Sequence, residues 1–164
     1  MINILKIFLL FVLLPIGCDD DDNPVVQIPS ECDEEFVKNP NVGDDHQLCV
    51  PDNFVYYTSA QFAYYFIDDI YFDGNPISGN DWIASFNEDI CVGAKRWGDC
   101  PEEDSHCELV ASGKIGGDPT GNTDEYLEVG DTPIFRIYIA SEKKYYDASV
   151  FEPVDPFAHL HTQL

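Results

Sequence analysis

Beyond residue 61, the apolar residues of this chain recur with the period of a β-strand rather than that of a helix. Residues 62–67 (FAYYFI) alternate two sets of large side chains, which predicts a long central strand covered on both faces. Residues 134–139 (IFRIYI) and 145–151 predict the last two strands, with a polar turn between them. A strong turn signal at residues 73–76 (DGNP) follows the aromatic run. The pattern therefore predicts an all-β fold.

Residues 81–97 (DWIASFNEDICVGAKRW) predict two short strands joined by a tight turn. With a two-residue turn at 87–88 or 88–89, the numbers of two opposed residues sum to an odd number. Opposed residues share a face, so even-numbered residues of the first strand lie on the same face as odd-numbered residues of the second. The predicted core face therefore has five members, namely Trp82, Ala84, Phe86, Cys91 and Gly93. The opposite face is also largely apolar, so we expect a strand pair covered on both sides. We also expect both tryptophans, Trp82 and Trp97, to hold the core.

Length and composition suit one folded domain. The chain has 164 residues, 13 % of them aromatic, with 11 Gly and 11 Pro, a composition that favours strands and turns. We predict an antiparallel β-sandwich, jelly-roll or immunoglobulin-like, with disulfide-bonded loops. The expected divisions are a signal peptide (1–17), an acidic, proline-rich linker and lead-in (18–51), the sandwich (52–152) and a C-terminal tail (153–164).

The charge balance limits the partners. Acidic residues number 31 against 8 basic ones, for a formal net charge of −23. Phosphates would be repelled, which excludes nucleic acid and an anionic membrane surface. The acidity suits an extracellular domain that must stay soluble, with cation binding as the alternative. Asp118, Asn122 and Asp124 in a glycine-rich loop offer calcium ligands, although their spacing is not that of an EF-hand. We expect no other cofactor.

Residues 1–22 carry targeting signals. The apolar run at 7–14 is too short to span a bilayer and reads as the core of an export signal. The segment LPIGC, ending at Cys18, resembles the lipobox of bacterial lipoproteins, which implies cleavage before Cys18 and a membrane anchor of acyl chains on it. The run DDDD at 19–22 resembles the surface-export signal of Bacteroidetes-type lipoproteins, which implies the extracellular face of the outer membrane. An ordinary signal peptide followed by a hydrated spacer is the alternative.

Export to an oxidising compartment predicts disulfides among the remaining five cysteines. Cys100 and Cys107 bracket a hydrophilic excursion with no other ordering force. Cys32 and Cys49 bracket a segment with few apolar residues, where a bridge would stabilise the fold by about 3 kcal/mol. Hairpin parity leaves Cys91 in the core as a free, unreactive thiol.

A wider resemblance rests on three stretches, QFAYYF at 61–66, NDWIASFNEDICVGAKRW at 80–97 and GDTPIFRIYIASEKKYYDA at 130–148. Together they resemble a β-sandwich module of secreted and cell-surface proteins of Bacteroidetes-like bacteria. That pattern usually has an Asn-Gly turn where this chain has Asn87-Glu88. The resemblance implies a fold and a surface location, and no activity.

These observations favour a non-catalytic cell-surface binding, adhesion or display module, with a glycan or a protein as ligand. The first alternative is a structural subunit of an extracellular assembly, and the second is a glycoside hydrolase-like enzyme. The sequence has no Ser-His-Asp signature and no phosphate loop, so we predict no catalytic residue. His106 and Cys107 are neighbours of the kind found in metal sites, but we expect Cys107 to form a disulfide instead. His159 and His161 lack the further ligands that a zinc site needs.

Overall fold

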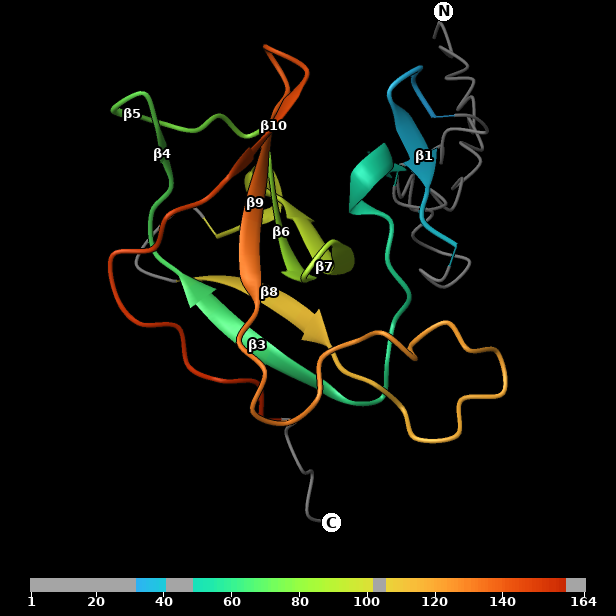
Figure 1. Cartoon of the computed structure of the whole chain (residues 1–164). Helices are drawn as coiled ribbons and strands as arrows, with labels where there is room; N and C mark the ends of the chain where they lie inside the picture. Colours follow the sequence, from blue (N-terminus) through green and yellow to red (C-terminus); the bar gives the residue numbers. More distant parts are fainter. Residues whose placement is uncertain (1–31, 41–48, 102–105, 159–164) are drawn as a thin grey trace, which may run out of the picture.

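The computed structural model describes residues 32–40, 49–101 and 106–158, coloured in Figure 1. Its strands are β1 (Phe36–Lys38), β2 (Cys49–Pro51), β3 (Phe62–Ile67), β4 (Tyr71–Phe72), β5 (Asn75–Pro76), β6 (Trp82–Asn87), β7 (Ile90–Arg96), β8 (Cys107–Ser112), β9 (Ile134–Ile139) and β10 (Lys144–Asp147). Two 3-10 turns, η1 (Asp52–Phe54) and η2 (Trp97–Asp99), complete the elements. Within these described ranges, no helix is long and apolar enough to cross a membrane. Cys18, His159 and His161 lie outside the described residues.

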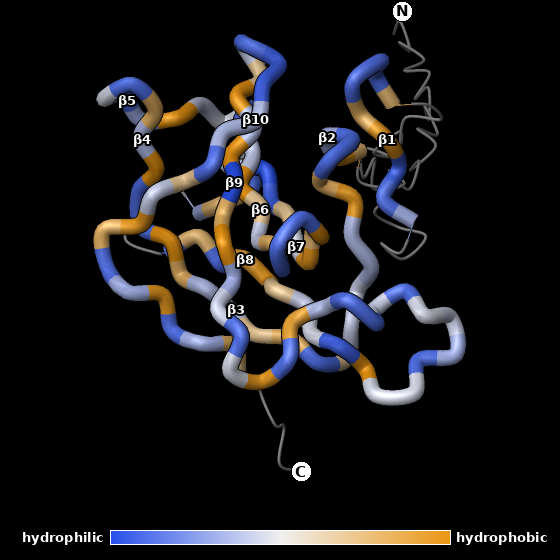
Figure 2. The backbone as a smooth tube through the Cα atoms, in the orientation of Figure 1, coloured by the Kyte–Doolittle hydropathy of each residue, from blue (hydrophilic) through white to orange (hydrophobic). Residues whose placement is uncertain are grey.

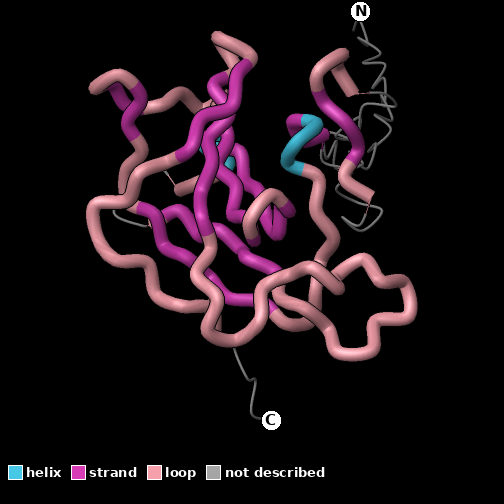
Figure 3. The backbone as a smooth tube through the Cα atoms, in the orientation of Figure 1, coloured by secondary structure: helices cyan, strands magenta, loops and turns pink. Residues whose placement is uncertain are grey.

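A four-stranded sheet with the order β10-β9-β6-β7 forms the centre of the molecule. The two-stranded ribbon β3-β8 packs across one of its faces, and all pairs of named strands are antiparallel (Figure 1). The predicted all-β fold with antiparallel sheets is therefore confirmed, and its layers are consistent with a β-sandwich. Loops make up much of the remaining chain, the longest of them running from residue 113 to 133 between β8 and β9 (Figure 3).

The β6-β7 hairpin turns at residues 88 and 89, one of the two registers predicted. Phe86 is opposite Cys91, as the odd-sum rule requires, but Ala84 is opposite Ala94 and Ser85 is opposite Gly93. The register shifts between Ser85 and Phe86, so β7 carries one extra residue there, a β-bulge. The predicted position of Gly93 is wrong, because the bulge moves it to the other face of the sheet and puts Ala94 in its place.

Both faces of the central sheet are covered, as predicted. On one face, Trp82, Ala84, Phe86 and Cys91 pack against Val50 and Phe54 from the N-terminal segment. On the other face, two clusters join the sheet to the β3-β8 ribbon, and they are built around Val92 with Ala63 and Ala111, and around Ile83 with Leu109 and Ile137. Figure 2 shows the hydrophobic residues gathered along these inner strands. Because Val50 is fully buried, the core begins N-terminal to residue 52.

The predicted long central strand at 62–67 is wrong in its position. β3 has six residues and pairs with β8 alone, so it lies at an edge. Its inward side chains include Ala63, which is buried, and Tyr65, which stacks edge-on against Phe135 of β9. Its outward side chains are open, with Tyr64 41 % and Phe66 61 % exposed. β3 thus carries large side chains on both of its faces, but only one of these faces is covered.

Candidate binding cleft

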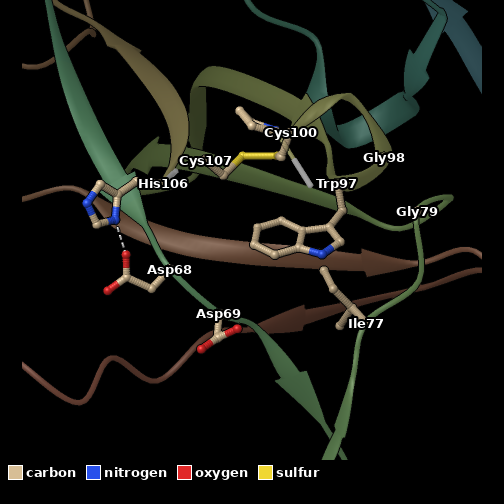
Figure 4. Close-up of a pocket in the computed structure, with 10 residues that line it drawn as sticks. Asp68, Asp69, Ile77, Gly79, Trp97, Gly98, Cys100, His106 and Cys107 are labelled. Atoms are coloured by element: carbon tan, nitrogen blue, oxygen red, sulfur yellow. Dashed lines mark hydrogen bonds and ion pairs between the residues drawn. A yellow bond between two sulfur atoms is a disulfide. The ribbon is translucent and has the colours of Figure 1, made fainter. Parts of the chain in front are cut away.

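A cleft of about 790 Å³ lies in the described surface where β3 ends, β7 ends and β8 begins. The indole of Trp97 lies at its centre, between the Cys100–Cys107 disulfide and Ile77, and the acidic side chains of Asp68 and Asp69 lie across from it (Figure 4). Trp97 is half-buried and packs with its inner side on the core around Ile83. The expectation that Trp97 is simply a core residue is therefore only partly right, since its ring also forms the wall of the cleft.

Backbone contacts hold this wall in place. Trp97 donates its N–H to the carbonyl of Asp81 (2.8 Å), and Gly98 donates to the carbonyl of Gly79 (2.9 Å). A Cβ on Gly98 would lie 2.5 Å from the Gly79 oxygen, so only glycine allows this approach. Asp81 is buried, and its carboxylate accepts hydrogen bonds from the N–H groups of Ser78 (2.6 Å) and Ala140 (2.8 Å). The cleft is thus built on the sheet rather than on a free loop.

The polar side-chain groups of the cleft are two carboxylates, one imidazole and the indole N–H of Trp97. His106 pairs with the carboxylate of Asp68, and its ring also meets Phe66 edge-on, with 6.0 Å between centroids. The two side chains of the pair are 60 % and 73 % exposed, so both groups stay hydrated. Lysine and arginine are missing from the described lining. Such a surface favours a neutral or cationic ligand over an anionic one.

The structure confirms the predicted disulfides. Cys32 bonds to Cys49 and Cys100 bonds to Cys107, with Cα separations of 5.6 Å and 5.0 Å. Cys91 is the free cysteine among the described residues and is buried. Burial raises the pKa of its thiol to about 12, so the reactive thiolate is scarce at neutral pH. Since the second disulfide forms part of the cleft wall, the pair Cys100–Cys107 organises the site.

The predicted calcium ligands lie in the loop before Leu127, away from the cleft. Asp118 accepts hydrogen bonds from the N–H and hydroxyl groups of both Thr120 and Thr123, at 2.7–3.2 Å. These bonds, those from Thr120 first, lower the pKa of Asp118 to about 2. Within the described ranges, no group of three or more His, Cys, Asp or Glu side chains is arranged to hold a metal ion. The structure thus shows the Asp118 carboxylate ordering its own loop.

A second, smaller hollow of about 400 Å³ lies at the turn end of β6. Its charged centre is Arg136, whose guanidinium lies 4.5 Å from the centroid of the Phe86 ring. Asp89 and Asp147 both pair with Arg136, at 2.9 Å and 3.0 Å, and raise its pKa. Because two carboxylates already neutralise this arginine, the hollow offers less to a ligand than the Trp97 cleft does.

Comparison of the chain with protein-family models, curated proteins and solved structures finds no match. The cleft residues must therefore be interpreted from their own geometry. From the sequence, Asp68 and Asp69 were not singled out and were not joined to Trp97. Two adjacent carboxylates directly after an aromatic strand were the available signal, but they are 28 residues or more from Trp97 in the chain.

Proposed function

We propose that this protein is a surface-anchored, non-catalytic binding module that binds a glycan in the Trp97 cleft. The observation that carries the proposal is an aromatic ring in a concave site that also holds the carboxylates of Asp68 and Asp69. A sugar has apolar C–H faces that stack on an indole and hydroxyl groups that donate to carboxylates. Asp68 and Asp69 are placed for the second role.

Charge narrows the class of glycan. The described lining has carboxylates and no lysine or arginine, and the whole chain carries −23. A sulfated or uronic-acid polymer would be repelled, whereas a neutral glycan or one bearing amino groups would not. An ammonium group would also be attracted to the indole face and to both carboxylates.

Binding is favoured over catalysis by the exposure of the polar groups. A working acid or base needs a desolvated, preorganised setting, but Asp68 and His106 are both more than half exposed. Both cysteines of the cleft are in a disulfide and provide no nucleophile. The cleft therefore supports recognition better than bond cleavage.

The anchoring part of the proposal rests on residues 14–22 of the sequence, the lipobox-like segment and the acidic run. A lipid-anchored domain facing the exterior meets glycans of its surroundings, which agrees with a binding role. Replacing Cys18 with serine should move the protein from the membrane fraction to the soluble fraction. Retention of the C18S chain in washed membranes would contradict the anchor.

The binding role is tested with the full chain on an array of neutral, amino-bearing and acidic oligosaccharides, followed by calorimetry on each hit. Trp97→Ala should weaken binding at least about tenfold, in line with the loss of one stacked ring. Phe151→Ala removes a fully exposed aromatic ring that does not line the cleft and should leave binding unchanged. Asp69→Ala removes the acceptor oxygens of an exposed side chain and so tests the acceptor role without touching the core.

Two results would contradict the proposal. Equal binding by the Trp97→Ala and Phe151→Ala chains would place the ligand elsewhere. Release of reducing ends from a bound oligosaccharide, abolished by Asp69→Ala, would identify an enzyme. Thermal denaturation of each variant separates loss of the site from loss of the fold.

A further inference from the structure

The outer edge of β3 is an unprotected strand edge. Gly113 donates its N–H to the carbonyl of Gln61, so odd-numbered residues of β3 direct their backbone groups to β8. The N–H and C=O groups of Phe62, Tyr64 and Phe66 therefore point away from β8. None of the backbone hydrogen bonds recorded between described residues outside the ladders involves these three residues. They form a row of unpaired donors and acceptors along an aromatic strand.

The other strand edges of the sandwich carry the devices that prevent pairing. β7 has a bulge and ends in Lys95 and Arg96, and β10 begins with Lys144 and ends with Asp147. The second edge of β8 faces the central sheet, where the Val110 carbonyl accepts the hydroxyl of Ser85 (3.3 Å). β3 alone among these has neither charge nor proline nor bulge. An edge of this kind is a template for another strand.

We propose that β3 pairs edge to edge with β3 of a second copy of this chain, which joins the two ribbons into a continuous sheet of the order β8-β3-β3-β8. A two-fold axis perpendicular to the sheet keeps the outward faces on one side and makes paired residue numbers sum to an even number. With the axis at Tyr64, the sum is 128. Phe62 then pairs with Phe66 of the other copy, and Tyr64 pairs with itself.

This register pairs every free backbone N–H and C=O group of the edge. All three outward residues of each copy form hydrogen-bonded pairs, and the rings of half-buried Phe62 and of exposed Tyr64 and Phe66 become cross-strand aromatic neighbours. Asp68 and Asp69 fall opposite Ala60 and Ser59 of the other copy, so like charges are never directly opposed. A second copy thus satisfies the edge without a mismatch, and this self-complementarity is the reason to choose it over an unrelated strand.

The net charge opposes this dimerisation and gives it a characteristic dependence on salt. Each copy carries −23, so the two repel over a distance that salt shortens. Dimerisation through β3 should therefore strengthen from low to high salt, whereas an interface held by ion pairs would weaken.

The direct test introduces a cysteine at the axis. Paired residues at a hydrogen-bonded site have Cα atoms about 5.5 Å apart, within the range that a disulfide can bridge. Under mild oxidation, the full chain in detergent with Tyr64→Cys should form a covalent dimer. Tyr71→Cys is the matched control, because Tyr71 is 54 % exposed in β4 and lies off the edge.

Sedimentation provides the second arm. The wild-type chain should show a reversible monomer–dimer equilibrium that shifts to dimer with salt, and Tyr64→Lys should weaken it about tenfold while Tyr71→Lys does not. Equal cross-linking of the two cysteine variants, a monomer at every salt concentration, or an undiminished dimer with Tyr64→Lys would each overturn the proposal. Circular dichroism of the lysine variants confirms that the comparison is made on folded chains.

Discussion

At Gly93 the central sheet lies so close to β8 that a Cβ has no room, and replacing this glycine with alanine tests this arrangement. A Cβ at this position would lie 1.7 Å from the carbonyl oxygen of Val110 in β8 and 3.1 Å from the hydroxyl oxygen of Ser85. Ordinary contact begins at 3.4 Å, so the layers would have to separate by about 1.7 Å along this line. The obstructing atom belongs to the backbone and cannot turn aside.

The energetic cost of Gly93→Ala follows from that separation. Opening a close-packed interface by more than 1 Å removes a large part of its dispersion energy, and the hydrogen bond from Ser85 to Val110 would be lost as well. We expect the free energy of unfolding to fall by about 3–4 kcal/mol, beyond the usual cost of overpacking. Since small domains have about 5–15 kcal/mol in total, the variant should be close to unfolding.

Urea denaturation of the wild-type, Gly93→Ala and Gly116→Ala chains measures this cost. Gly116 is the control because a Cβ there meets nothing within 4 Å, so its substitution should change stability by less than about 0.5 kcal/mol. A Gly93→Ala chain as stable as the wild type would refute the bulged register. In the unbulged hairpin, residue 93 would face Val50 and Phe54 instead of β8.

Two further predictions concern titrating groups. Because the pKa of Asp118 is held near 2 in the folded state, below its ordinary 3.8, the hydrogen bonds of its loop are fully stabilising above about pH 4 and are lost as the pH falls towards 2. The protection factors of the Thr120 and Thr123 amides, taken against the intrinsic exchange rate at each pH, should fall over that window and should be low at all pH values in Asp118→Asn, and a flat profile in the wild type would contradict this. Cys91 should resist iodoacetamide at mildly alkaline pH in the native chain and react on unfolding, followed by peptide mass spectrometry, because burial raises the pKa of its thiol to about 12. Rapid labelling of the folded chain would show that the site is open.

Features set by neighbours in the sequence were predictable. β9 spans Ile134–Ile139, the bounds that the alternation of IFRIYI predicted, and Asp73-Gly74 forms the turn between β4 and β5 with φ values of 49° and 76°. The disulfide pairs also followed from spacing and from the polarity of the segments they close. In each case, the physical cause lies within one short stretch of the sequence.

Features set by distant contacts were not predictable. Alternation of large side chains in FAYYFI cannot show whether a second sheet covers one face or both, and the structure covers only the face with Ala63 and Tyr65. The cleft has the same origin, since Trp97, Asp68 and Asp69 line one cleft only because the ends of β3 and β7 lie beside the start of β8. No local sequence pattern indicates that these three residues lie together.

The bulge in β7 connects these two kinds of feature. One inserted residue lets Cys91 keep the core position that a two-residue turn gives it, while turning Gly93 towards β8. If β7 were regular, a side chain would stand where β8 must pass, and the ribbon could not approach the sheet. The ends of β7 and β8 would then not hold Trp97 and the Cys100–Cys107 disulfide side by side. The proposed binding site thus depends on a one-residue irregularity near the turn of the hairpin, which explains why Gly93→Ala should destabilise the cleft and the fold together.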